Sequence, residues 1–327
     1  MHAIRQYEFG PAESLVYEEV PDLTPGDGQV RIAVEASGVH LLDTTIRAGV
    51  PGGPFPLPDL PMTPGREVAG TVDAVGPGVE GRWLGRRVVA HLGRASGGYA
   101  EAAVAAATSL HEVPGTVRAE QAVAMIGTGR TALLVLDAAR LGPDDVVLVT
   151  SAAGGLGSLF VQAGRRAGAT VVGVAGGESK AVAVRDHGAH VAVDYRQPGW
   201  ADAVRAELGD RHVTVALDGV GGEVGRTALE LIGPGGRLVL FGWSSGEATK
   251  LDAMDLYRNA LTVTVPLGPA ATKGPGGLRW LEERSLAALA AGELVPVVNP
   301  PFRLADAAAA HTALTERRTM GKVVLVP

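Results

Sequence analysis

The sequence predicts an α/β fold in two parts: a compact, partly barrelled β domain followed by a doubly wound parallel sheet. Residues 1–120 contain short runs with the two-residue alternation of half-buried strands, whereas apolar strands at 191–195, 213–218 and 236–241 each follow a helix-compatible segment. The chain of 327 residues is long enough to build two hydrophobic cores.

The N-terminal part is expected to be a sheet with turn-rich connections. Strands are predicted at 29–36, 68–75 and 86–90, separated by glycine- and proline-containing turns at 25–28 and 76–78. Six prolines and three glycines lie between positions 51 and 65, a composition that excludes a helix or a central strand. We expect an ordered surface loop there, able to wall a substrate pocket.

The second part begins with a helical pattern over 118–140, interrupted at Gly127-Thr128-Gly129, and continues with a βαβ unit over 145–177. In this unit a β-branched strand leads into the turn 151–157, a helix and a second strand. The glycines would permit a tight turn, let backbone N–H groups approach a pyrophosphate, and let the helix pack closely at Gly157. An ordinary strand-to-helix turn is the alternative.

The end of the second strand indicates which dinucleotide would bind. An NAD site of this kind places a carboxylate about 20 residues after the first glycine, to accept from the ribose hydroxyls. Here Ala175, Gly176 and Gly177 hold that place, and Ser179 and Lys180 follow. A hydroxyl donor and a cation suit a 2′-phosphate, so the sequence predicts NADP(H), with Glu178 pointing to solvent.

Composition and charge exclude several classes of protein. The net charge of −6 and the lack of a basic run argue against a nucleic-acid partner. No apolar leader or run of about 18 apolar residues is evident, so we expect no membrane partner and a cytoplasmic location. The absence of cysteine removes thiol nucleophiles, thiolate zinc sites and iron–sulfur clusters. His187 and His190 are too few to predict a metal site.

Seven motifs in order make the chain resemble the medium-chain dehydrogenase/reductase superfamily, within it the zinc-free, ζ-crystallin-like NADPH:quinone oxidoreductase branch. They lie at 36–43, 47–49, 64–72, 98–101, 152–157, 241–246 and 321–325. The resemblance implies a GroES-like catalytic domain over 1–122 and 268–327, and a Rossmann NADP(H)-binding domain over 123–267. The tail 321–327 is expected to return to the first domain as a strand.

The resemblance also implies which residues contact the cofactor. The pyrophosphate would lie on Ala153, Gly154, Gly155, Leu156 and Gly157, and the adenosine 2′-phosphate near Gly176, Ser179, Lys180, Tyr195 and Arg317. Thr131 would lie beside the nicotinamide, and Phe241, Gly242 and Ser244 would form the turn over its ribose. For Tyr195, the alternative is an aromatic residue packed on the sheet edge.

Departures from the family pattern are equally informative. His40-Leu-Leu-Asp43 offers no thiol, and Gly65-Arg66-Glu67 has Arg where the zinc enzymes have His, so no catalytic metal is expected. In the quinone reductases the position of His40 is commonly Asn and that of Thr45 often Tyr. Trp243 fills a position that is usually smaller and polar.

These features indicate hydride transfer from NADPH to an acceptor that is already electrophilic, such as a quinone or an α,β-unsaturated carbonyl. His40, Thr131 and Thr45 are the candidate donors to the acceptor oxygen, and His40 could also supply a proton. Alternatively, His40 merely packs. We expect Asp43, Arg47, Arg66 and Glu67 to form structural ion pairs, and Asp218 to cap the next helix.

Two other functions remain open: an enoyl reductase for a biosynthetic intermediate, and an NADPH-binding protein whose catalytic site has decayed. The resemblance further implies a homodimer formed through the nucleotide domains. The β-branched run 261–267 is a candidate for pairing across a two-fold axis, or else an interior strand of one sheet. A helix is predicted at 278–291.

Overall fold

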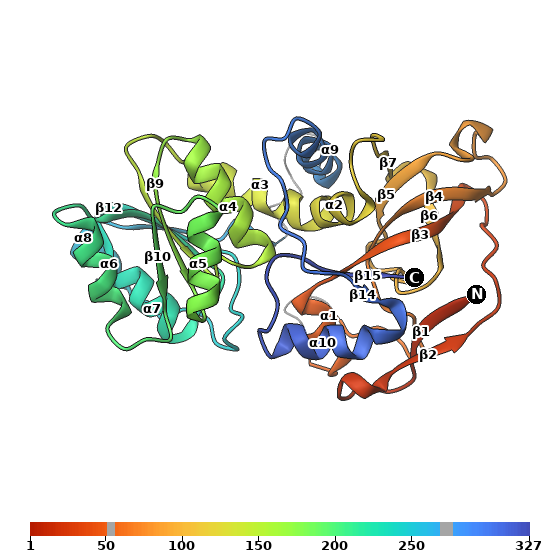
Figure 1. The fold of residues 1–327 in the computed structure, drawn as a ribbon, viewed down its shortest axis with the longest axis horizontal. Helices are drawn as coiled ribbons and strands as arrows, with labels where there is room; N and C mark the ends of the chain where they lie inside the picture. Colours follow the sequence, from red (N-terminus) through yellow and green to blue (C-terminus); the bar gives the residue numbers. More distant parts are fainter. Residues whose placement is uncertain (51–55, 269–276) are drawn as a thin grey trace. The chain divides into compact units, whose positions relative to one another are not determined.

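The computed structural model describes residues 1–50, 56–268 and 277–327 (Figure 1). The chain divides into two compact units. Unit 1 comprises Met1–Gly129 and Glu282–Pro327, and unit 2 comprises Arg130–Leu281. Of the predicted loop at 51–64, residues 51–55 lie outside the described residues.

Unit 1 is built on a mostly antiparallel sheet with the strand order β14-β15-β3-β4-β5-β7, and β6 also pairs with β3. Its strands are β3 (Gln29–Val39), β4 (Glu67–Val75), β5 (Arg87–His91), β6 (Ala102–Ala106), β7 (Leu110–Glu112), β14 (Phe302–Arg303) and β15 (Val323–Val326). A separate pair is formed by β1 (His2–Gln6) and β2 (Leu15–Glu19). The strands predicted at 29–36, 68–75 and 86–90 are confirmed.

Alternation of side chains explains the core of unit 1. Val30, Ile32 and Val34 on β3 are buried together with Val68 and Val72 on β4. The tail returns to this sheet as predicted, because β15 pairs antiparallel with β3. Helices α1 (Leu41–Arg47), α2 (Ala119–Ala124) and α10 (Ala307–Thr315) complete the elements that concern the site, and α9 spans Gly277–Ala290.

Unit 2 contains a parallel sheet with the strand order β10-β9-β8-β11-β12-β13. Its strands are β8 (Val146–Thr150), β9 (Thr170–Ala175), β10 (Val191–Asp194), β11 (Val213–Asp218), β12 (Ile232–Leu240) and β13 (Thr262–Thr264). Its helices are α3 (Arg130–Ala139), α4 (Gly155–Arg166), α5 (Glu178–Asp186), α6 (Trp200–Leu208), α7 (Gly222–Glu230) and α8 (Ala253–Asn259). This order reverses direction between β8 and β11, which is the switch point where doubly wound sheets bind ligands.

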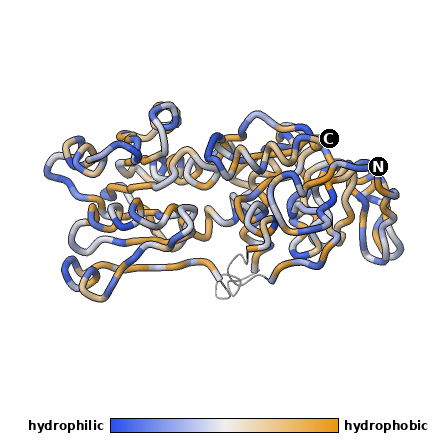
Figure 2. The backbone as a smooth tube through the Cα atoms, turned by 90° about the horizontal axis from the view of Figure 1, so that it is seen from below, coloured by the Kyte–Doolittle hydropathy of each residue, from blue (hydrophilic) through white to orange (hydrophobic). Residues whose placement is uncertain are grey.

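Orange, hydrophobic stretches run through the backbone in Figure 2. All five residues of β8 are buried, as continuous apolar parallel strands require. The run predicted at 261–267 is a strand only over Thr262–Thr264, paired with β12 and at the edge of the described sheet. The proline at 266 cannot donate a ladder hydrogen bond, which explains the early end of this strand.

The predicted interruption of the 118–140 helix is a π-helical turn, Met125–Gly129, between α2 and α3. Within the described residues, the stretch Ala119–Ala139 has the length and hydropathy of a membrane-crossing helix, a feature that the sequence analysis did not recognise. Charged side chains at Glu120, Arg130 and Asp137 interrupt its apolar run. Because 67% of its most hydrophobic window is buried inside the protein, the stretch has the character of a core helix.

Candidate functional site

The turn between β8 and α4 in unit 2, which the sequence predicts to hold the pyrophosphate, is tightly constrained. Ser151 adopts a left-handed conformation (φ 51°), and the Ala152 N–H donates to the Val174 carbonyl at 3.0 Å, which ties the turn to β9. A Cβ at Gly157 would collide with the Ser151 carbonyl oxygen. Only glycine therefore allows the first turn of α4 to pack against this segment, as the sequence predicts.

The parallel sheet brings most of the predicted cofactor residues to one edge, where the strands end (Figure 1). Ala153, Gly154, Gly155, Leu156 and Gly157 follow β8; Gly176, Ser179 and Lys180 follow β9; Tyr195 follows β10; and Phe241, Gly242 and Ser244 follow β12. Thr131 lies in unit 2 at the start of α3, whereas Arg317 lies in unit 1 after α10. The parallel fold thus explains why these segments, which are distant in sequence, lie together at the carboxyl ends of the strands.

Two polar side chains that follow β10 lie close to the glycines at the carboxyl end of β9. The Tyr195 hydroxyl lies 2.8 Å from where a Cβ of residue 176 would be, and the Arg196 guanidinium lies against Gly177. Glu178 is exposed, as expected, and Lys180 lies in the first turn of α5. This end of the strand therefore carries a hydroxyl group and cations and suits an added phosphate.

Arg196 is a residue that the sequence analysis missed, although its place directly after Tyr195 was a usable signal. Asp194 holds it by accepting from the Arg196 backbone N–H at 2.9 Å and from Nε at 3.4 Å. Asp194 also accepts from the Gly177 N–H at 2.7 Å. Burial opposes ionisation, but these hydrogen bonds outweigh it and lower the pKa of Asp194. The arginine side chain itself is 64% exposed and accessible to a ligand.

The turn after β12 is fastened to the loop after β11. The Phe241 and Ser244 N–H groups donate to the carbonyls of Asp218 and Gly219 at 2.9 and 3.0 Å. The buried Asp218 carboxylate accepts from Val220 N at 2.9 Å and Gly221 N at 3.2 Å. The predicted cap is not formed, because both N–H groups precede α7 and no side chain caps its first turn. These bonds fix the shape of the turn that carries Phe241, Gly242 and Ser244.

Unit 1 contains a cluster of charged side chains around His40, the residue that precedes α1. Glu67 Oε1 lies 2.7 Å from His40 Nε2, and Glu67 Oε2 lies 2.9 Å from Lys322 Nζ. Lys322 Nζ is also 2.8 Å from His40 Nε2 and 3.3 Å from Thr128 Oγ1. Glu67 is fully buried and the Lys322 side chain is 4% exposed, whereas the His40 side chain is 28% exposed. We call these four residues the His40 cluster.

Close packing fixes the position of the Glu67 carboxylate, and the neighbouring charges determine its protonation. A Cβ at Gly38 or Gly127 would collide with its carboxylate, so glycines on both sides make room for it. Burial opposes ionisation, yet the charges of His40 and Lys322 outweigh burial and hold the Glu67 pKa well below its usual range. The carboxylate is therefore ionised at neutral pH. As expected, Glu67 forms structural ion pairs, but its partners are His40 and Lys322.

The other charges of this region form a second buried network. The Asp43 carboxylate accepts from the His40 N–H at 2.8 Å and from the Tyr99 hydroxyl at 3.3 Å, and Arg66 Nε lies 3.6 Å from Asp43 Oδ1. Tyr99 also contacts His311 Nε2 at 3.1 Å. These contacts position the start of α1, and hence His40.

Two side chains near this network differ from the predicted arrangement. Arg47 is buried, and among the described residues its Nε and Nη1 have no hydrogen-bond partner. Thr45, on α1, donates from Oγ1 to the Leu41 carbonyl at 3.3 Å. Its role as a donor to a substrate stays a prediction.

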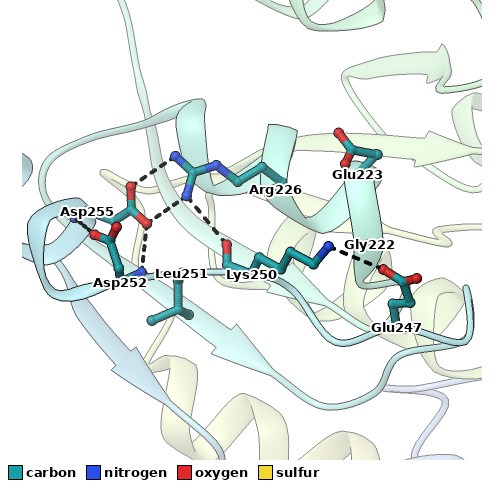
Figure 3. Close-up of a pocket in the computed structure, with 8 residues that line it drawn as sticks. All are labelled: Gly222, Glu223, Arg226, Glu247, Lys250, Leu251, Asp252 and Asp255. Atoms are coloured by element: carbon teal, nitrogen blue, oxygen red, sulfur yellow. Dashed lines mark hydrogen bonds and ion pairs between the residues drawn. The ribbon is translucent and has the colours of Figure 1, made fainter.

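A separate pocket of about 320 Å³ lies in unit 2 between α7 and the segment that leads into α8 (Figure 3). Arg226 forms two hydrogen bonds with Asp255, at 2.6 and 2.9 Å, and Lys250 pairs with Glu247 at 3.7 Å. The arginine lowers the pKa of Asp255 to about 2. Because these opposite charges pair with one another, the contacts join α7 to α8, and we assign this pocket no ligand.

Comparison with known proteins agrees with this geometry. Residues 26–115 match the family model "Alcohol dehydrogenase GroES-like domain", and residues 155–283 match "Zinc-binding dehydrogenase". A 2-haloacrylate reductase from a Burkholderia species is 34% identical over 100% of this chain and 99% of its own length. A quinone oxidoreductase from Pseudomonas aeruginosa is 33% identical, with 98% and 97% covered.

Solved structures give the same result. A mycobacterial protein solved in complex with NADPH has 35% identity and a TM-score of 0.86, with both chains fully covered. The Escherichia coli quinone oxidoreductase complexed with NADPH has 29% identity and a TM-score of 0.87, again with full coverage of both chains. Fold and glycine turn together define a two-domain, nucleotide-binding oxidoreductase.

Sequence identity along the whole chain places the protein more narrowly. It belongs to the medium-chain dehydrogenase/reductase superfamily and is a quinone oxidoreductase-like member of it. The predicted combination of a GroES-like domain with a Rossmann-like domain is confirmed.

One of the two family models is named for zinc binding, which raises the question of whether the side chains of this chain could hold a catalytic zinc ion. His40 and Glu67 are ligand-type side chains, but the Lys322 ammonium lies 2.8 and 2.9 Å from them, where a metal cation would be. Within residues 1–50, 56–268 and 277–327, no three His, Cys, Asp or Glu side chains are grouped to hold a metal. The donor set does not fit a catalytic zinc ion, and we derive no step through one.

Proposed function

We propose that this protein is an NADPH-dependent reductase that transfers hydride to a quinone or another α,β-unsaturated carbonyl compound, without zinc. The observation that carries the proposal is the carboxyl end of β9. It lacks the acidic residue that an NAD ribose requires, and it presents the Tyr195 hydroxyl and the Arg196 guanidinium instead. The relatives named quinone oxidoreductase and those solved with NADPH support this cofactor and reaction.

The predicted residues fit NADP(H) as follows. The turn Ala153, Gly154, Gly155, Leu156 and Gly157 would hold the pyrophosphate at the N-terminus of α4, where N–H groups and the helix dipole favour anions. Gly176, Ser179, Lys180, Tyr195 and Arg317 would surround the 2′-phosphate, and Arg196 joins them. Thr131, Phe241, Gly242 and Ser244 would position the nicotinamide end. When bound, the cofactor supplies the hydride.

The chain's own contribution is orientation and charge. Negative charge develops on the acceptor oxygen, and a positioned donor stabilises it. His40, Thr45 and Thr131 are the proposed donors. His40 is the partly exposed member of its cluster, and Asp43 and Glu67 fix its backbone and its ring. A 2-haloacrylate, named for one relative, and a quinone share an electron-poor double bond, so the same donors serve either acceptor.

The catalytic domain would comprise 1–122 and 268–327, and the NADP(H)-binding domain 123–267. A homodimer through the edge strand β13 and a cytoplasmic location belong to the same proposal. Trp243, which is 54% exposed, is a proposed wall of the acceptor site.

The test is consumption of NADPH, with NADH in parallel, against a benzoquinone, a naphthoquinone, a simple enone, a 2-haloacrylate and an enoyl thioester. Turnover with NADPH well above that with NADH supports the proposal, and the best acceptor identifies its class. A marked preference for the enoyl thioester would favour the enoyl reductase. Binding of NADPH without reduction of any acceptor would favour a binding protein.

A further inference from the structure

In the His40 cluster, two groups that can carry a proton, the Lys322 amine and the His40 ring, lie beside one carboxylate. His40 Nε2 faces both an anion, Glu67 Oε1 at 2.7 Å, and a cation, Lys322 Nζ at 2.8 Å. A ring nitrogen carries either a lone pair or a hydrogen, so it can accept from the ammonium or donate to the carboxylate, but not both. The cluster therefore has two hydrogen-bonding states that differ in the position of one proton.

These two states have the same net charge. In the first, Lys322 is an ammonium that hydrogen-bonds His40 Nε2 and Thr128 Oγ1 and forms an ion pair with Glu67 Oε2, and the histidine is neutral with its hydrogen on Nδ1. In the second, the proton has moved from Nζ to Nε2, and the imidazolium forms an ion pair with Glu67 Oε1, which lies 2.7 Å away. The Glu67 carboxylate contacts both positions of the proton, so it stabilises the positive charge in either place.

We propose that Lys322 is the proton reservoir of His40, and that Glu67 and Lys322 are positioning residues that direct the His40 Nδ1 hydrogen to the acceptor. This inference rests on the proposed function, because His40 needs an acceptor anion to protonate. As the Nδ1–H bond breaks and an O–H bond forms on the reduced acceptor, a Nζ–H bond breaks and a Nε2–H bond forms. One proton leaves Lys322 and one reaches the acceptor oxygen. Solvent later returns a proton to the amine.

The surroundings favour transfer along this route. The Lys322 backbone is held on both sides, its N–H by the Val297 carbonyl at 2.8 Å and its carbonyl by the Asn299 N–H at 2.9 Å. The charged or titratable groups that face the cluster include His91, on β5 near Glu67, and the buried Tyr99, which also interacts with Glu67. Asp43 is a third, and its carboxylate is occupied by the His40 backbone N–H and the Tyr99 hydroxyl. His40 is the member with substantial exposure, so protons leave the cluster through its ring.

The first test needs no substrate. Nitrogen-15 chemical shifts of the His40 ring distinguish the two neutral tautomers in the free protein. We expect the Nδ1–H form in the wild type and in Lys322→Arg, which keeps a donor to Nε2. In Lys322→Met, Nε2 has only Glu67 as its partner, so the Nε2–H form is expected. An unchanged tautomer in Lys322→Met would overturn the proposal, whether or not any acceptor is reduced.

The second test is the pH profile of single-turnover reduction with the best acceptor. A guanidinium has a pKa above about 12 and keeps its proton, so Lys322→Arg retains the ion pair but cannot act as a reservoir. We expect the rates of both variants to fall about 100-fold below that of the wild type as the pH rises to alkaline values, because neither can pass a proton to His40 Nε2 and general acid catalysis contributes at least about that factor. Lys250→Met, which removes an exposed lysine outside the cluster, should keep the wild-type profile. Full rescue by arginine at alkaline pH would reduce Lys322 to a structural role.

Discussion

The Arg196 guanidinium brings positive charge to the carboxyl end of β9, where only NADPH among the two nicotinamide cofactors would place a phosphate. We predict that Arg196→Gln raises the KM for NADPH about 10-fold, the effect of losing one charge-assisted hydrogen bond, and leaves the KM for NADH unchanged. Initial-rate kinetics with both cofactors measure this. Arg211→Gln is the matched control, because Arg211 bonds Thr170 at the opposite end of the same strand. Equal changes for both cofactors would contradict the assignment.

A second prediction at the scale of residues concerns His311, which lies on α10 and is fully buried against Tyr99. Burial lowers its pKa to about 4, so the unfolded chain takes up a proton near pH 6.5 that the folded protein rejects. Stability should therefore fall as the pH drops from about 6.5 to 4, by up to about 3 kcal/mol for this group. Urea denaturation between pH 7 and 5 tests it.

In that measurement His311→Gln should flatten the pH dependence, and His187→Gln, at an exposed position after α5, should not. Glu67 does not interfere in this window, because a carboxylate with a lowered pKa loses its stabilising effect only below the ordinary range, about pH 4.5. The account of His311 fails if the slopes of the wild type and His311→Gln coincide.

Single residues also mark the limit of what the sequence predicts. The glycine turn and the missing acid at 175–177 are local patterns, so Gly157 and the NADP(H) preference could be inferred directly. The contact of Lys322 with His40 could not, because the two residues come from opposite ends of the chain and meet only when β15 pairs with β3. Arg196 was missed for a different reason, since an exposed arginine is common and its direction depends on Asp194.

At the scale of elements, the close packing of α4 on the turn after β8 depends on Gly157. We predict that Gly157→Ala lowers the free energy of unfolding by about 2 kcal/mol, as overpacking does, and weakens NADPH binding at least about 10-fold because the turn must shift. Gly142→Ala serves as the control, because a Cβ there would meet only Asp145 Oδ2, at an ordinary contact distance of 3.9 Å. Chemical denaturation and fluorescence titration with NADPH check both effects. Unchanged binding in Gly157→Ala would remove the turn from the proposed site.

The presence of the strands and helices could be predicted from hydrophobic periodicity, whereas their ends depend on individual residues such as proline and glycine. Continuous apolar runs predicted β8, β9 and β11, because strands buried on both faces need no polar positions. The strand at 261–267 was predicted too long, since proline ends β13 after Thr264. The π-helical turn at Met125–Gly129 could be foreseen only as an interruption, because two glycines weaken a helix without specifying its replacement.

For the whole molecule, the proposed homodimer has a direct test at the edge strand β13. Val265, just beyond this strand, is 60% exposed, and a two-fold axis would bring its copies together. We predict that Val265→Lys shifts the protein to monomer at low micromolar concentration through repulsion of like charges. Val182→Lys, on α5 with 56% exposure, should not. Sedimentation velocity distinguishes these outcomes, and a wild type that is monomeric throughout would refute the dimer.

The measurement that tests the proposed reaction most directly is the transfer of deuterium from NADPH labelled at nicotinamide C4 to an enone or a 2-haloacrylate. We predict that the label from one of the two C4 positions appears on the carbon of the reduced double bond that is β to the carbonyl or carboxylate, as mass spectrometry and NMR of the product would show. The label at that carbon resists exchange with water, so its presence identifies hydride transfer. NADPH-dependent reduction that yields a product without deuterium from either position would contradict the account.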